Sequence, residues 1–183
     1  MKFLSTSLNG VIVVETDVVS DYRGSFSRIF CERELVRIIG EKKIAQINYS
    51  ITTVPGTVRG IHYQNSPHAE TKLIRCTKGQ VWDIAVDMRA GSPTFLQWHA
   101  EELSSENTRM LIIPEGCAHG FQSLVADSEL LYLHTDFYTP ESERGVSYND
   151  PQLSIPWPLP IKNLSKRDQS FPSIPHGFSG INL

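Results

Sequence analysis

The chain has 183 residues, 40% of them hydrophobic and 20% charged, and a formal net charge of −3. This size and composition are typical of one globular domain with a sizeable core, and the charge argues against nucleic acid or an anionic membrane as the main partner. The N-terminus is a poor signal peptide, no apolar stretch reaches the ~18 residues that cross a bilayer, and the three cysteines are scattered. We therefore expect residues 1–183 to form a single domain in the cytoplasm.

One helix is predicted near residues 32–40, where Leu35, Ile38 and Ile39 share a face and Gly40 ends the apolar pattern. Almost everything that follows or precedes it alternates between short β-like runs and turn-forming residues. The predicted strands cover residues 9–16, 25–30, 45–53, 57–64, 71–77, 80–88, 95–103, 108–114, 118–124 and 129–138. About ten strands at a spacing of roughly 8–12 residues indicate an all-β sandwich or barrel.

The C-terminal part of the chain is rich in proline. Seven of the eleven prolines lie between Pro140 and Pro175, so the segment from about 139 to 183 cannot supply central strands. It still carries Leu153, Ile155 and Trp157 to bury. We expect this irregular segment to wrap the barrel as ordered loops or short helices.

Side-chain alternation assigns several polar residues to inward strand faces. Lys72, His119 and Tyr132 each share a face with apolar residues of their own strand. Arg59 and His62 have opposite parity, and a bulge between them would bring both to one side. Because the interior of a small barrel is either filled or lines one ligand cavity, these residues are candidates for lining such a cavity.

A metal site is the first possible use of these residues. His62 and His119 lie on separate strands, and the sequence PEGCAH has the Pro-x-Gly-x-x-His spacing of metal-binding cupin barrels. Those barrels usually carry a second histidine where this chain has Gln64, which is a poor metal ligand. Two histidines without a reliable third ligand make a weak site, so we expect no metal.

Acid–base chemistry and anion binding are the other possible uses. His62 is a natural base near neutral pH, although a single strand histidine is more often a core residue bonded to a carbonyl. Tyr132 is equally consistent with barrel filling. Lys72 on an interior face is costly unless it is paired or binds an anion. The arginines are dispersed, without a glycine-rich phosphate loop. The pattern alone therefore indicates a small β-barrel with a polar cavity that holds His, Lys and Tyr.

Nine motifs in order resemble those of the dTDP-4-dehydrorhamnose 3,5-epimerase family, over roughly residues 10–172. They are DYRGSF (21–26), QINYS (46–50), RGIHYQ (59–64), PHAETKL (67–73), DIAVDMRAGSPTF (83–95), IPEGCAHGF (113–121), LYLHTDFYTPESERG (131–145), YNDPQLSIPWP (148–158) and LSKRD (164–168). The resemblance implies an all-β fold, a cupin-type jelly-roll β-barrel, together with a homodimer and no metal or other cofactor.

The resemblance also implies epimerisation at C3 and C5 of a nucleotide-linked 4-keto-6-deoxy sugar, from dTDP-4-dehydro-6-deoxy-D-glucose to dTDP-4-dehydro-L-rhamnose. It implies that His62 is the base, oriented by Asp168, that Tyr132 is the acid on the opposite face, and that Lys72 stabilises the enolate oxygen at C4. The remaining matching positions are candidates for substrate binding: Arg23, Phe26, Arg28, Gln46, Asn48, Arg59, Gln64, His119, Tyr138, Glu143 and Arg167. In the family, the segment that holds Arg23 and Phe26 contributes to the neighbouring subunit's site.

Three positions depart from the family pattern. Arg28 stands where many members carry Glu, Glu70 where Gln is usual, and Leu133 where Lys is common. They leave the base and the acid intact but leave the exact sugar open. The alternatives are a C3-only epimerase of a related 4-keto deoxysugar nucleotide, a non-catalytic sugar-nucleotide-binding cupin, and a metal-dependent cupin enzyme. An opposed acid and base favour the epimerase, because binding alone needs neither.

Overall fold

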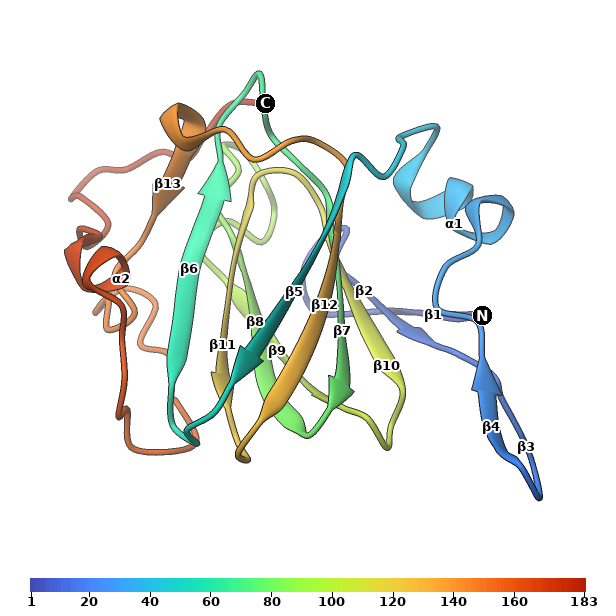
Figure 1. Ribbon diagram of the computed structural model, residues 1–183. Coiled ribbons are helices and arrows are strands. Elements are labelled where there is room, and N and C mark those ends of the chain that lie inside the picture. The colour runs from blue at the N-terminus through green and yellow to red at the C-terminus, as the bar shows by residue number, and fades with distance from the viewer.

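The computed structural model describes residues 1–183 and contains two antiparallel sheets packed face to face (Figure 1). The first sheet contains, in spatial order, β1 (Lys2–Ser5), β2 (Ile12–Glu15), β10 (Arg109–Ile113), β7 (Lys72–Lys78), β12 (Ser128–His134) and β5 (Gln46–Thr52). The second contains β13 (Glu143–Gly145), β6 (Val58–Gln64), β11 (Cys117–Ser123), β8 (Gln80–Asp87) and β9 (Trp98–Ser104). From β5 to β13 successive strands alternate between the two sheets, except for the β8–β9 hairpin, so the predicted jelly roll is confirmed.

The predicted elements are found along the chain with small shifts at their ends. Each of the ten predicted segments contains a strand, and helix α1 (Glu32–Ile39) ends at Gly40, whose φ is +67°. Three short strands were not predicted: β1, β3 (Val18–Asp21) and β13. Helix α2 (Lys166–Ser170) and the 3₁₀ turn Pro140–Ser142 lie in the C-terminal segment, where short helices were expected without defined bounds. Each has five residues or fewer, which is too short for a clear period. Neither helix has the length and hydrophobicity needed to span a membrane.

Apolar side chains fill three layers. The central layer lies between the sheets and includes Ile74, Leu111 and Phe121, all almost fully buried. A second layer lies on the outer face of the first sheet, where Leu35 and Ile39 of α1 pack. The third lies on the outer face of the second sheet, under the C-terminal segment. Both faces of the β-sandwich are therefore partly covered, which explains why many strand residues are buried on both sides.

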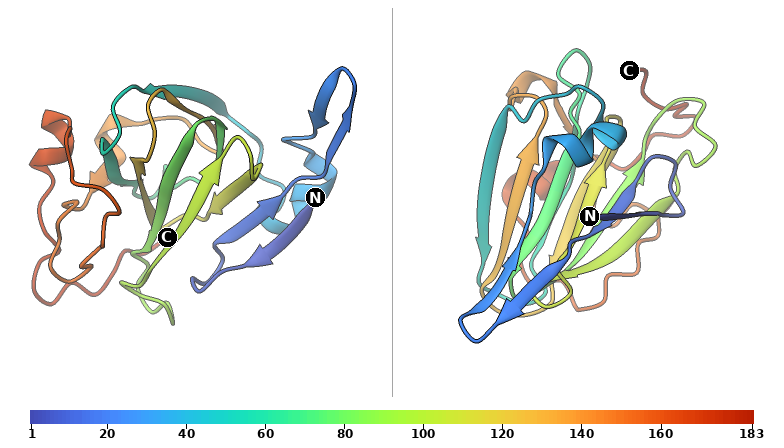
Figure 2. Two further views of the ribbon diagram at one scale, coloured as in Figure 1. Left: turned by 90° about the horizontal axis from the view of Figure 1, so that it is seen from below. Right: turned by 90° about the vertical axis from the view of Figure 1, so that its right-hand side faces the viewer.

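The C-terminal segment runs across the outer face of the second sheet as loops, the single 3₁₀ turn Pro140–Ser142, the short strand β13 and helix α2 (Figures 1 and 2). Polar side chains fix its backbone. The indole of Trp98 donates to the carbonyl of Leu153 at 2.9 Å, and the amide of Gln122 exchanges hydrogen bonds with the backbone of Leu159. Helix α2 lies beside β6 (Figure 1). That residues 1–183 form a single folding domain stays a prediction.

A bulge in β6 decides which side chains enter the barrel. His62 pairs with His119 and Gly60 pairs with Gly120, so one residue of β6 is left over between them. Gly60 has a φ of +119°, and a Cβ there would lie 2.4 Å from the Cα of Gly120. Only glycine fits this close approach. The bulge offsets the opposite parity of Arg59 and His62, as expected, and both reach the same cavity.

Replacing Gly60 with alanine should therefore destabilise the protein strongly. Gly91 is the matched control, because its φ is +69° but a Cβ there would meet nothing within 4 Å. We expect Gly91→Ala to cost about 1 kcal/mol from backbone strain alone, and Gly60→Ala to cost at least ~2 kcal/mol more. Urea unfolding of the two variants measures this difference. Equal losses would show that the approach of β6 to β11 is not sterically limiting.

Candidate active site

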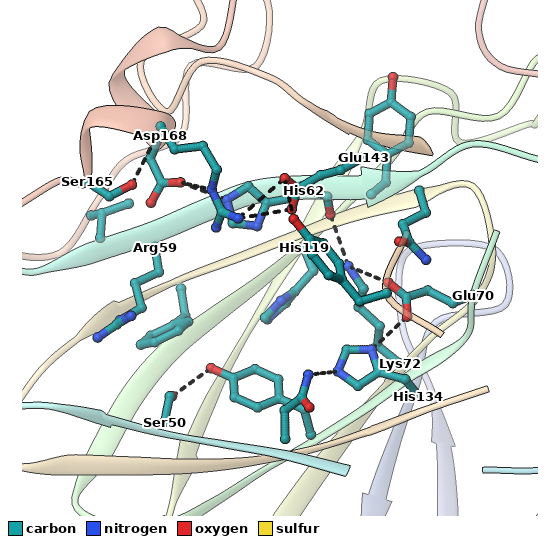
Figure 3. Close-up of a pocket in the computed structure, with 18 of the residues that line it drawn as sticks. Ser50, Arg59, His62, Glu70, Lys72, His119, His134, Glu143, Ser165 and Asp168 are labelled. Carbon is teal, nitrogen blue, oxygen red and sulfur yellow. Dashed lines mark hydrogen bonds and ion pairs between the residues drawn. The ribbon is translucent and has the colours of Figure 1, made fainter. Parts of the chain in front are cut away.

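A cavity of about 560 Å³ opens between the two sheets (Figure 3). Its walls come from β5, β6, β7, β11 and β12, and α2 with the loop before it closes one side. Of the residues that the sequence nominated, the following line it: Asn48, Arg59, His62, Gln64, Lys72, His119, Tyr132, Tyr138, Glu143, Arg167 and Asp168. Residues far apart in the sequence are thus brought to one place. Inward parity predicted this for Lys72, His119 and Tyr132, whereas Asn48, Tyr138, Glu143, Arg167 and Asp168 were candidates through the family resemblance alone.

His62 on β6 is hydrogen-bonded to Asp168 on α2. The Nε2–Oδ1 distance is 2.8 Å, and the Asp168 side chain is only 3% exposed. The chain folds this way locally because Ser165 caps α2: its Oγ accepts from the Asp168 amide at 3.0 Å. No protein group bonds His62 Nδ1. With the Nε2 proton on the Asp168 side, Nδ1 carries a free lone pair toward the cavity.

The pKa values of this pair favour a neutral base beside an anion. Burial lowers the pKa of His62 below 6.5, although the hydrogen bond and charge of Asp168 oppose the shift. Burial alone raises the pKa of Asp168, but the hydrogen bond and charge of His62, together with Ser165 and Arg167, outweigh burial, so the pKa of Asp168 lies below its usual 3.8. At neutral pH, His62 can therefore accept a proton while Asp168 stays ionised.

Tyr132 lies on β12 in the opposite sheet, so it faces His62 across the cavity. Its hydroxyl is 3.0 Å from Ser50 Oγ on the neighbouring strand β5. Burial is the main reason that the pKa of Tyr132 lies above its usual 10.0. The phenol therefore keeps its proton at neutral pH and can give it up only to a stronger base, such as a carbanion.

His119 on β11 forms a second histidine–carboxylate pair. Its Nε2 is 2.9 Å from the Oδ2 of Asp83, which is fully buried on β8. The edge of its ring meets the ring of Tyr132 at a centroid distance of 6.2 Å. Asp83 therefore fixes the orientation of His119, and His119 in turn packs against Tyr132.

Lys72 has the buried counter-ion that its interior position required. Its Nζ is 3.4 Å from Glu70 Oε1 and donates to the backbone carbonyl of His62 at 3.3 Å. The other oxygen of Glu70 is 2.7 Å from His134 Nδ1. Glu70 and His134 were not among the predicted catalytic or substrate-binding residues. The parity that His134 shares with Tyr132 was the available signal.

Charged and aromatic side chains surround the mouth of the cavity. Arg167 pairs with Glu143 at 3.2 Å, and the hydroxyl of Tyr138 donates to the same carboxylate at 3.3 Å. Arg59 is held by the carbonyl of Ile51 at 3.2 Å. These guanidinium groups are accessible and match the geometry of phosphate oxygens.

Gln64 and Gln46, which were predicted to bind substrate, form side-chain hydrogen bonds to the backbone. The side chain of Gln64 donates to the carbonyls of His68 and Phe137 and accepts from the amide of Thr139. Gln46 does not line the cavity, and its side chain accepts from the Tyr138 amide at 2.8 Å. Both residues therefore fix the loop that carries Tyr138 at the mouth.

Three nominated residues lie away from the cavity of their own chain. Arg23, Phe26 and Arg28 belong to or follow the hairpin of β3 and β4 (Gly24–Ser27), which projects from the sheets (Figures 1 and 2). Arg23 pairs with Asp21 at 2.6 Å, and Phe26 is 71% exposed. That this hairpin serves a neighbouring subunit's site stays a prediction.

The chain offers no clear metal-binding set. No group of three or more His, Cys, Asp or Glu side chains is arranged to hold a metal ion. His62 and His119 each bind a carboxylate of their own, and the amide of Gln64 is taken up by backbone.

Known proteins are similar to this chain over most of its length. Residues 5–176 match the family model described as dTDP-4-dehydrorhamnose 3,5-epimerase. The enzyme of that name from Sinorhizobium fredii is 41% identical over 175 residues, which cover 95% of this chain and 90% of the relative.

Solved structures match the fold as closely. The dTDP-4-dehydrorhamnose 3,5-epimerase from Bacillus anthracis, solved with TDP and PPi bound, gives a TM-score of 0.91 at 36% identity, covering 94% of this chain and 99% of that one. A dTDP-6-deoxy-D-glucose-3,5-epimerase from Legionella pneumophila, in complex with dTDP-4-keto-L-rhamnose, gives 0.89 at 39% identity, covering 94% and 92%. With a family match over most of its length and relatives near 40% identity, the chain belongs to the dTDP-4-dehydrorhamnose 3,5-epimerase family of isomerases.

Proposed function

We propose that the cavity epimerises dTDP-4-dehydro-6-deoxy-D-glucose at C3 and C5, giving dTDP-4-dehydro-L-rhamnose, by removal and return of protons. The observation that carries the proposal is the pairing of a neutral, Asp168-oriented His62 on one sheet with a protonated Tyr132 on the facing sheet. A carbon inverts when one face loses a proton and the other face gains one. The two residues are arranged for these two steps.

In the proposed mechanism the C4 ketone makes the protons on C3 and C5 acidic. His62 Nδ1 removes one proton, and the ionised Asp168 stabilises the imidazolium that forms. The electrons move to the C4 oxygen, where the ammonium of Lys72 stabilises the enolate. Tyr132 then returns a proton from the opposite face. Exchange of protons with water restores the neutral imidazole of His62 and the phenol of Tyr132, and the same steps then occur at the second carbon.

The rest of the substrate would lie toward the mouth. Arg59 and Arg167 supply forked N–H donors for the diphosphate, and Tyr138 presents a half-exposed ring on which a base can stack. Support comes from the relatives solved with TDP and with dTDP-4-keto-L-rhamnose. Asn48 and His119 also line the cavity, and their side chains are candidates for holding sugar hydroxyls.

We infer that the reaction needs no metal and no other cofactor. The ketone supplies the acidity, and Lys72 supplies the positive charge that a Lewis acid would otherwise provide. The two histidines best placed as ligands are each committed to a carboxylate. A cytoplasmic location is also proposed, and all three cysteines are free thiols, which fits a reducing compartment.

His62→Asn should abolish proton exchange because the amide cannot act as a base. Loss of a general base typically costs about 10²–10⁴ in rate. Incubation of the sugar nucleotide in D₂O, followed by NMR, measures deuterium at C3 and C5. His68→Gln is the control, since this histidine is 41% exposed and lines no part of the cavity.

The same experiment separates the alternatives. Deuterium at both carbons in the wild type, with an L-configured product, supports double epimerisation. Exchange confined to C3 would make the protein a C3-only epimerase. No exchange in the wild type would favour a non-catalytic binding cupin, and near-wild-type exchange in His62→Asn would refute the assignment of the base.

The pH dependence of the rate follows from the pKa of His62. A histidine base works when neutral, so activity holds above its pKa and falls as the pH drops through it. Since burial places that pKa below 6.5, the acid limb of kcat/KM should have its midpoint below pH 6.5.

Two variants should move that limb in opposite directions. The charge of Asp168 raises the pKa of His62, so Asp168→Asn should shift the midpoint to lower pH while reducing the rate. The charge of Arg167 lowers it, so Arg167→Gln should shift the midpoint to higher pH. A limb that neither variant moves would belong to another group.

A homodimer is the proposed assembly. Strand β5 forms an open edge of the first sheet, and Ile47, Tyr49 and Ile51 on it are about half exposed or more. A second copy would cover this apolar edge and offer a site for the projecting hairpin. Light scattering should give about 41 kDa, twice the 20.6 kDa of one chain, and Ile47→Asp should reduce it toward 20.6 kDa. A stable, fully active monomer would contradict the proposal.

A further inference from the structure

Glu70 lies between two cationic or potentially cationic side chains inside the cavity (Figure 3). Lys72 on β7 and His134 on β12 are directly opposite each other in the antiparallel register. Their side chains are about 10% exposed, and that of Glu70 is 7% exposed. The carboxylate of Glu70 contacts both side chains.

The carboxylate is shared unequally. Glu70 Oε2 is 2.7 Å from His134 Nδ1, whereas Oε1 is 3.4 Å from Lys72 Nζ. Burial alone raises the pKa of Glu70, but the hydrogen bond from His134 and the charge of Lys72 hold the pKa below 4.5, so Glu70 is ionised at neutral pH. The anion is therefore held closest to the imidazole.

Contacts with Asn48 and Tyr132 fix the orientation of the His134 ring. Its Nε2 is 3.4 Å from the Asn48 amide on β5, and its ring stacks on Tyr132 at a centroid distance of 6.2 Å. The imidazole thus has a fixed plane, with Nδ1 directed at Glu70. A chain of polar contacts runs from Asn48 through His134 and Glu70 to Lys72.

The geometry leaves one donor of Lys72 free. An ammonium has three N–H bonds, and Lys72 directs one to the carbonyl of His62 and one toward Glu70. A closer, direct pair with Glu70 would draw the ammonium away from the cavity and offset its charge, which would weaken its action on a developing oxyanion.

We propose that Glu70 and His134 are a positioning pair for Lys72: His134 retains the Glu70 carboxylate by a hydrogen bond, so that Glu70 orients the ammonium without capturing it. This rests on the proposed function, in which Lys72 acts on the C4 oxygen. Glu70 and His134 are positioning residues in this scheme, because both act through Lys72.

The test compares the activity of the double variant of Glu70 and His134 with that of the single His134 variant. His134→Leu removes the retaining hydrogen bond, so Glu70 closes on Lys72, and kcat should fall about 10- to 100-fold with a smaller change in KM. Glu70→Gln removes the charge but keeps an acceptor, so alone it should cost only a few-fold. Glu70→Gln combined with His134→Leu should be more active than His134→Leu, because no anion remains to capture Lys72.

Conservative replacement supplies a second readout. His134→Asn keeps an N–H donor near the position of Nδ1 and should retain most of the activity. If His134→Leu does not fold, His134→Ala takes its place, again with and without Glu70→Gln. His68→Gln is the control, because His68 pairs with Asp136 at 3.5 Å outside the cavity.

Lys72→Met separates this proposal from the proposed function. If Lys72→Met still catalyses deuterium exchange, Lys72 does not stabilise the enolate. The proposed positioning role of Glu70 and His134 is then refuted as well. If Lys72→Met loses exchange but the double variant is no better than His134→Leu, the role of Lys72 stands and the positioning pair is refuted. Rescue by Glu70→Gln supports both.

Discussion

Placing ionised side chains between two apolar sheets costs several kcal/mol per ion unless each finds a partner. The cavity meets this constraint with three histidine–carboxylate pairs: His62 with Asp168, His119 with Asp83, and His134 with Glu70. In each pair the carboxylate is almost completely buried and the imidazole is the more exposed partner. The carboxylates therefore stabilise and orient a cavity surface that can hold charge, which an ordinary β-sandwich interior cannot.

The bulge in β6 supplies the geometry that these pairs need. Without the extra residue beside Gly60, strict alternation would place Arg59 and His62 on opposite faces of the sheet. With it, an anion-binding guanidinium and a base enter the same cavity from one strand. The close contact of Gly60 with Gly120 is the steric condition for that arrangement.

The sequence predicts the fold and much of the site because strand alternation is a local property. The inward faces of Lys72, His119 and Tyr132 follow from two-residue periodicity within single strands, and the structure agrees. Short strands such as β1 and β13 carry no such period and were not predicted.

Contacts between residues in different parts of the fold could not be predicted from the pattern within a single strand. The pairing of Glu70 with His134 joins residues 64 positions apart, and it depends on the register of β7 against β12 and on the turn that precedes β7. The positions of Arg23 and Phe26 relative to a site depend on a second chain. No single-strand pattern contains this information. The family resemblance supplied Asp168 as the partner of His62, which periodicity alone did not.

Asp168 lies in a part of the chain that is loosely joined to the two sheets. It is carried by a five-residue helix near the C-terminus, joined to the barrel by loops and side-chain contacts and by few sheet hydrogen bonds. Segments of this kind open locally at a lower free-energy cost than the central strands do. When this one detaches, His62 loses its carboxylate although both sheets persist. Thermal loss of turnover can then precede the cooperative melting of the sandwich, and amide exchange in residues 164–170 would report the difference between the two processes.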